Sequence, residues 1–397
     1  MRLLNTETRE LSEHSVGQIP PFAILSHRWG DDEVSYHDYV ERRVTDGIGY
    51  EKIIGFCNFA KSRKVPHQWV WVDSCCIDKR SSSELAEAIN SMYTWYRNAD
   101  MCYVYMRDFE VTGKRKRDED QDFRASNWFT RGWTLQELLA PSTVIFCDRN
   151  WKEFGTKTTL ATQIQQASGI PRLFLQGENQ PQKASIAMRM SWMSRRATTK
   201  PEDIAYCMLG LFDVNMPLLY GEGDRAFMRL QQEIIKRSDD ESIFAWTSDV
   251  SEWGMLAPSH KAFQGSADIV NIRLRPEERM PFFMTNKGLH FPSSSDTEAL
   301  DKVDQSTRLP MGYPDHVVEL GCFFGHSSGM THEDPGIEEA WEEGTLTIEL
   351  KRCGPLWMRV NCKELGQRCN SQRRKRQNGT YVGKGVQRVY IVQQPNL

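Results

Sequence analysis

The chain has 397 residues, of which 39% are hydrophobic and 26% charged, and its net charge is −3. This composition is typical of a globular protein with a large core, and it excludes binding of nucleic acid through bulk positive charge. There is no apolar run of about 18 residues, no apolar signal-peptide core, and no Cys-x-x-Cys pair among the ten cysteines. We therefore expect reduced thiols, no membrane span, no nucleic-acid partner and a cytoplasmic location, with the nucleus as the alternative.

Three apolar runs in the first 110 residues each end abruptly in polar side chains. Residues 22–25 lead into Ser26, His27, Arg28 and Trp29, residues 69–72 lead into Asp73, and residues 101–105 are followed by two charged residues. Such runs fit strands that are buried on both faces of a parallel sheet. Because ligands bind beyond the carboxyl ends of such strands, we expect a site where these polar residues converge.

Residues 50–64 and 82–98 lie between the predicted strands and carry apolar residues at helical spacing. A charged insert at 114–120 is predicted to be a solvated or disordered loop, with a nuclear-localisation signal as the less favoured interpretation. A short helix over 127–140, stopped by Pro141, and a strand over 143–147 complete the unit. The alternation of strands and helices predicts an α/β fold with a mostly parallel sheet.

The pattern of apolar residues changes twice after this unit. Helical periodicity continues to about residue 236, over 158–167, 184–193, 201–211 and 224–236. Short β-type runs follow at 243–246, 317–320, 346–350 and 388–392, separated by turn residues. We therefore predict an α/β domain over residues 1–150, a helical extension packed on it over 151–246, and a β-rich domain over 247–397.

Three blocks of sequence carry a family resemblance: residues 22–30, residues 71–78 together with 83–85, and residues 131–138. Through them the chain resembles the fungal heterokaryon-incompatibility (HET) domain proteins, with the domain covering about residues 22–150. Residues 196–206 and 216–223 resemble segments that accompany this domain. The resemblance implies a role in fungal nonself recognition, in which the domain triggers programmed cell death.

HET domains are in turn remotely similar to the TIR fold, a flavodoxin-like sheet, and several TIR domains hydrolyse NAD with a glutamate in a Trp-x-x-x-Glu arrangement. By this resemblance Glu137 is the catalytic candidate and Trp133 its tryptophan. Residues four apart share a helix face, so the indole could pack beneath the carboxylate. A carboxylate there could stabilise the oxocarbenium-like centre formed when the nicotinamide–ribose bond breaks. The alternative is that Glu137 is a surface or capping acid and Trp133 a core residue.

The remaining candidates would hold the dinucleotide. Arg28 could clamp a diphosphate, Trp29 could stack on a base or on nicotinamide, and His27 could donate to a phosphate or ribose oxygen. The alternative is a structural turn in which Arg28 pairs with Asp73 or Asp78. These two acids could instead bind ribose hydroxyls or orient Arg28, and we expect no metal because nothing nearby completes an oxygen-rich shell.

Glu84 lies in the first turn of a predicted helix, where the helix dipole favours acids in any case. It also matches a familiar position of the HET family, so a site role stays open.

The sequence leaves two classes of function open. In the first, the chain is a cell-death effector of vegetative incompatibility that hydrolyses NAD or a related nucleotide, acts as a homo-oligomer and responds to an upstream recognition protein. In the second, it is a non-enzymatic adaptor that self-associates through the HET domain, or a nucleotide sensor without turnover. NAD enters only as a possible substrate, and we expect no resident cofactor.

Overall fold

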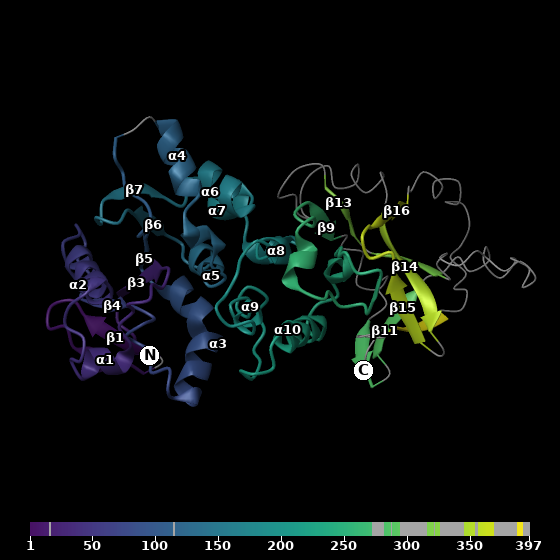
Figure 1. Cartoon of the computed structure of the whole chain (residues 1–397), viewed down its shortest axis with the longest axis horizontal. Helices are drawn as coiled ribbons and strands as arrows, with labels where there is room; N and C mark the ends of the chain where they lie inside the picture. Colours follow the sequence, from purple (N-terminus) through teal and green to yellow (C-terminus); the bar gives the residue numbers. More distant parts are fainter. Residues whose placement is uncertain are drawn as a thin grey trace, which may run out of the picture. The chain divides into compact units, whose positions relative to one another are not determined.

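The computed structural model describes residues 1–271 apart from 16, 114 and 115, and then residues 282–286, 288–293, 316–320, 322–325, 345–353, 356–368 and 387–391. The chain forms two compact units (Figure 1). The first comprises Met1–Pro181 and Arg196–Ala226, and the second comprises Gln182–Arg195 and Phe227–Leu397.

The first unit is built on a mixed sheet of seven described strands in the order β2-β1-β4-β3-β5-β6-β7. The four central strands run parallel to one another, and both edges are antiparallel. The strands are β1 (Arg2–Asn5), β2 (Leu11–Glu13), β3 (Phe22–His27), β4 (Trp69–Trp71), β5 (Met101–Tyr105), β6 (Val144–Cys147) and β7 (Glu153–Thr156). The predicted mostly parallel α/β sheet is thus confirmed.

Strand β3 lies at the centre of this sheet, and all six of its residues are buried. Helices α2 (Ile48–Lys61) and α3 (Ser82–Asn98) lie on either side of the central strands in Figure 1. This follows from the topology. Helix α2 connects β3 to β4 on one side of it, and α3 connects β4 to β5 on the other side. Because parallel crossovers are right-handed, crossovers in opposite directions place their helices on opposite faces of the sheet. On α3, the Tyr96 hydroxyl donates to the Leu25 carbonyl over 2.8 Å and fixes the helix to β3.

The other helices of the first unit are short. They are α1 (Tyr36–Val40), α4 (Lys116–Arg124), the 3-10 helix η1 (Asn127–Thr130), α5 (Thr134–Leu139), α6 (Ala161–Ser168), α7 (Arg172–Leu175) and α9 (Asp203–Tyr206). The 3-10 helix η2 (Pro181–Lys183) follows at the boundary of the two units. Every residue of α5 is buried.

Two local predictions for the first unit were wrong. The charged insert is helix α4 from residue 116 onward, because Phe123 anchors it among Phe109, Phe129, Phe146 and Phe154. The single helix expected over 127–140 is two helices, because the backbone between η1 and α5 bonds elsewhere. Gly132 N–H donates to the Ala197 carbonyl, and Ala197 N–H donates to the Thr130 carbonyl, both over 2.8 Å.

The second unit begins with helical elements, namely α8 (Ile186–Ser191), α10 (Arg225–Ile235), η3 (Glu241–Phe244) and η4 (His260–Phe263). A strand was expected over 243–246, but this prediction was wrong. The buried Arg359 side chain donates to the carbonyls of Phe244 and Trp246 over 2.8 and 2.6 Å, so these groups are not available to a neighbouring strand. The guanidinium also lies 3.9 Å from the centre of the Trp246 ring.

Strands follow in the described residues of the second unit, and β12, β14 and β17 lie where the sequence predicted strands. The strands are β8 (Glu252–Trp253), β9 (Ile269–Asn271), β10 (Phe283–Thr285), β11 (Gly288–Ser293), β12 (His316–Glu319), β13 (Cys322–Phe324), β14 (Thr345–Cys353), β15 (Leu356–Val360), β16 (Gly366–Arg368) and β17 (Gln387–Ile391). The second basic run, residues 373–376, lies outside the described residues. Over the part of the chain described, every helix is too short or too polar to cross a membrane.

Candidate functional site

A cavity of about 340 Å³ opens at the carboxyl ends of β3 and β5. It is lined by Arg28, Trp29, Tyr105, Met106, Arg107, Asp108, Asn127 and Trp128. From β3 the chain leads to β4 on one side, and β5 lies on the other, so the strand order reverses at this point. A topological switch point of a parallel sheet is where such folds bind ligands, and the cavity therefore marks the candidate site.

One wall of the cavity leads inward to Glu137 through two hydrogen bonds. The Trp128 indole N–H donates to Ser26 Oγ over 3.0 Å, and Ser26 Oγ–H donates to Glu137 Oε2 over 2.5 Å. All three side chains are buried, and Glu137 is only 4% exposed. The carboxyl group of Glu137 thus lies behind the cavity wall and is not part of the lining.

Glu137 is protonated at neutral pH in this arrangement. Burial on α5 raises the pKa of its carboxyl to about 8, against an ordinary value of 4.5. The nearby Arg131 charge and the Ser26 hydroxyl lower this pKa, whereas Asp73 raises it, and burial outweighs the favourable contacts. The group is therefore suited to donate a proton, and it is not a ready carboxylate.

His27 lies in a buried network of charges beside this pair. Its Nε2 is 3.6 Å from Glu33 Oε2 and 3.6 Å from Asp73 Oδ1, and Glu33 in turn binds Lys52. Burial lowers the pKa of His27, the Lys52 charge lowers it further, and the two carboxylates oppose them. His27 is thus an enclosed side chain whose pKa is lowered although two acids lie beside it.

Trp29 connects the cavity to this network. Its indole N–H donates to Asp73 Oδ2 over 2.8 Å. The Lys79 ammonium lies 3.3 Å from the ring centre and the Arg131 guanidinium carbon 5.5 Å from it. Burial raises the pKa of Asp73, but the His27, Lys79 and Arg131 charges more than offset it, so this pKa stays below its ordinary value.

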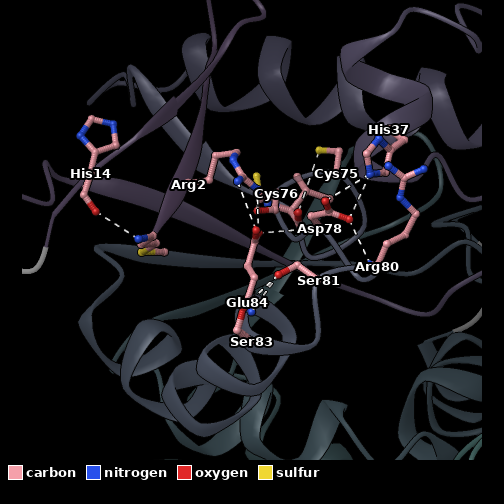
Figure 2. A network of polar contacts seen from close by, with 12 residues as sticks. Arg2, His14, His37, Cys75, Cys76, Asp78, Arg80, Ser81, Ser83 and Glu84 are labelled. Atoms are coloured by element: carbon pink, nitrogen blue, oxygen red, sulfur yellow. Dashed lines mark hydrogen bonds and ion pairs between the residues drawn. The ribbon is translucent and has the colours of Figure 1, made fainter.

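Asp78 and Glu84 belong to a different cluster, which is shown in Figure 2. Asp78 accepts from His37 Nε2 over 3.1 Å, and Asp78 N–H donates to Glu84 Oε1 over 2.8 Å. Glu84 also accepts two hydrogen bonds from Arg2, over 2.7 and 3.3 Å. These contacts fasten β1 to the start of α3, so both acids have structural partners away from the cavity.

Trp133 and Glu137 contact different groups although they are one helical turn apart. The Trp133 indole N–H donates to Asp203 Oδ2 over 3.3 Å, and Asp203 also accepts from the Tyr220 hydroxyl over 2.9 Å. The indole is thus bound to the downstream segment, whereas the Glu137 carboxyl points to Ser26.

The structure brings together Ser26, His27, Trp29, Asp73 and Glu137 as the sequence predicted. Arg28 lines the cavity, and its exposed side chain makes no hydrogen bond or ion pair with any described residue, so the alternative in which it pairs with Asp73 or Asp78 is not seen there. Sequence reasoning missed Trp128, Glu33, Lys52, Lys79 and Arg131. Of these, Arg131 opened one of the three family blocks, and the others had no sequence signal. Among the described residues no cluster of His, Cys, Asp or Glu could hold a metal ion.

Two segments of the chain match known protein families. Residues 22–114 match the family "Heterokaryon incompatibility protein (HET)", and residues 225–317 match a domain of unknown function, DUF8212. Residues 22–114, which include β3, β4 and β5 of the sheet, are thus similar to the HET domain.

A curated relative extends the likeness beyond the domain. The chain is 46% identical over 247 residues to the "Vegetative incompatibility protein HET-E-1" of Podospora anserina. The match covers 59% of this chain and 18% of that relative, so the chain corresponds to a small part of the relative's length. No solved structure gives a significant match.

Proposed function

We propose that the chain is a cell-death effector of fungal vegetative incompatibility whose HET domain hydrolyses NAD or a related nucleotide. The named relative supports the incompatibility role. The ligand role is supported by the cavity at the switch point of the parallel sheet. In chain order, the parallel strands are arranged second, first, third, fourth, which is the order of flavodoxin-like sheets and supports the TIR-like assignment.

The observation that carries the proposal is Glu137, held two hydrogen bonds behind the cavity wall with its pKa raised to about 8. Cleavage of the nicotinamide–ribose bond builds positive charge on the ribose, which an ionised carboxylate stabilises. Glu137 is neutral and covered as it stands, so the described arrangement is a resting state. Turnover requires Trp128 and Ser26 to move aside and the carboxyl group to lose its proton.

Assembly supplies a reason for such a change. A homo-oligomer that rearranges η1, where Trp128 lies, would open the path from the cavity to Glu137. Arg28 and Trp29 would then hold the nucleotide, with Asp73 fixing the Trp29 indole. The proposal also includes an upstream recognition protein that activates the chain and a cytoplasmic location. A β-rich domain would follow residue 246.

Nicotinamide release tests this function. The full chain is incubated with NAD at high and low protein concentration, with oligomer size measured in parallel, and Glu137→Gln is compared with Glu87→Gln. Glu87 is an exposed residue of α3 that does not line the cavity. We expect release by the oligomer of the native chain and of the Glu87 variant, and none by the Glu137 variant. Release that persists in Glu137→Gln would refute the assigned catalytic role.

The burial of Glu137 also favours the rival function, a non-enzymatic adaptor that self-associates through the HET domain. In that case the hydrogen bonds of Ser26 and Trp128 serve only to stabilise α5 against β3. The adaptor predicts that Glu137→Gln remains toxic in cells and that no nicotinamide is released by a demonstrated oligomer. A sensor without turnover predicts saturable nucleotide binding and no product.

A further inference from the structure

Two cations at the Trp29 ring form no direct ion pair with a described residue. Among the described residues, the side chains of Lys79 and Arg131 make no hydrogen bond and no ion pair, and each lies against the same indole. The Arg131 Nε atom is buried and lacks a hydrogen-bond partner. A guanidinium has five N–H donors, and a half-buried one normally binds a carboxylate, a phosphate or backbone carbonyls.

The charge balance around this ring is positive. The Asp73 carboxylate faces both cations and accepts from the Trp29 indole N–H over 2.8 Å, but its single negative charge balances only one of them, and Glu33 is paired with Lys52. Glu137 contributes no negative charge at neutral pH because burial raises its pKa to about 8. The exposed Arg28 adds a further cation at the cavity. The cations in excess of the Asp73 charge repel one another, and an anion bound among them offsets that repulsion.

The two cations also repel each other, which is reflected in the pKa of Lys79. The Lys79 ammonium is covered by the indole although the residue as a whole is exposed, and this loss of solvation lowers the pKa of Lys79. The Arg131 charge lowers it further, and Asp73 raises it. Cation–π contact with one ring stabilises each cation much less than a direct hydrogen-bonded anion would.

We propose that Lys79 and Arg131 form an anion-binding subsite, beside Trp29, for a phosphoryl group of the ligand held in the cavity. Trp29 belongs to the cavity wall and to this subsite alike. The planar guanidinium of Arg131 matches two oxygens of a phosphate, and Lys79 supplies a point charge. The inference rests on the ligand role of the cavity in the proposed function, and it narrows that ligand to molecules with a phosphate or diphosphate.

Direct binding tests the subsite without any turnover. The full chain is titrated calorimetrically with ADP, with inorganic pyrophosphate and with adenosine, which has no phosphate. We expect ADP and pyrophosphate to bind and adenosine to bind at least tenfold more weakly. The Lys79→Gln and Arg131→Gln variants should each weaken ADP binding by about tenfold to a hundredfold, the effect of losing charge-assisted hydrogen bonds.

Matched variants distinguish binding at this subsite from a general effect of positive charge on ADP binding. Lys64→Gln removes an exposed lysine just after α2 and should bind ADP as the native chain does. Arg131→Lys keeps the charge but loses the planar fork, so it should bind with intermediate affinity. The side chains of Lys79 and Arg131 form no hydrogen bond or ion pair with a described residue. The Lys79→Gln and Arg131→Gln variants should therefore keep the thermal unfolding midpoint of the native chain.

The outcomes distinguish the subsite from the proposed activity. Loss of ADP binding in both variants supports the subsite even when no nicotinamide is ever released, which would leave a nucleotide sensor. Equal binding of ADP and adenosine, no binding of either, or ADP binding that is unchanged in the two variants would overturn it. Nicotinamide release at native rates and native KM by both variants would also overturn the subsite while the hydrolase function stands.

Discussion

Replacing Glu137 by glutamine should change how the stability of the protein depends on pH. The folded-state pKa of Glu137 is about 8 and its ordinary value is 4.5, so the folded state holds a proton that the unfolded chain releases. A raised folded pKa gives a contribution that is complete below pH 4.5 and is lost as the pH rises towards 8. Glutamine has nearly the same shape and never ionises, so it removes this dependence.

The size of the effect follows from the two pKa values. One pKa unit corresponds to about 1.4 kcal/mol, and the linkage relation then gives a loss of about 3 kcal/mol between pH 5 and pH 8 from this one carboxyl group. Ser26 can still donate to the amide oxygen of the variant. At pH 8 we therefore expect Glu137→Gln to be more stable than the native chain by about that amount, and at pH 5 the two should nearly agree.

Urea unfolding followed by tryptophan fluorescence, repeated at several pH values from 5 to 8, measures this difference. The quantity of interest is the free energy of unfolding of the variant minus that of the native chain, because subtraction cancels the other titrating groups. Glu87→Gln, an exposed change on α3, is the control and should give a flat difference. If the difference for Glu137→Gln were equally flat, the buried, protonated state of Glu137 would be refuted.

Three further changes test other parts of the first unit. Trp128→Phe removes the donor to Ser26 and should lower the free energy of unfolding by about 1 kcal/mol, measured in urea. Glu33→Gln leaves Lys52 buried without its partner and should cost about 3–5 kcal/mol at pH 7. Burial raises the pKa of Glu33, but His27 and Lys52 lower it by more, so it lies well below its ordinary value. The loss of stability in Glu33→Gln should therefore shrink as the pH falls below 4.5. Glu84→Gln weakens the partly exposed contact with β1 and should lower the unfolding midpoint slightly, by less than about 1 kcal/mol, without changing ADP binding.

The central sheet could be predicted from the sequence because strands buried on both faces leave continuous apolar runs. Residues 22–25 and 101–105 have that pattern, and they became β3 and β5. The edge strands β1 and β2 gave no comparable signal, because β1 (RLLN) contains only two apolar residues and β2 (LSE) only one. Helix α4 and the break before α5 depend on contacts with Phe146 and Ala197, which lie far along the chain and which no local pattern reveals.

The same distinction holds for the candidate site. By itself the sequence determined which polar residues follow the parallel strands, because the end of an apolar run fixes where a side chain can leave the core. The expected grouping of Ser26, His27, Trp29 and Asp73 followed from that, whereas Glu137, which lies on α5, was a candidate only through the family resemblance. Only the tertiary structure decided that Asp78 and Glu84 take part in the contact between β1 and the start of α3. It also decided that Ser26 and Trp128 cover Glu137, and that Lys79 and Arg131 meet at Trp29. Protonation and charge balance depend on burial and on distances between remote segments, and these quantities exist only once the chain is packed.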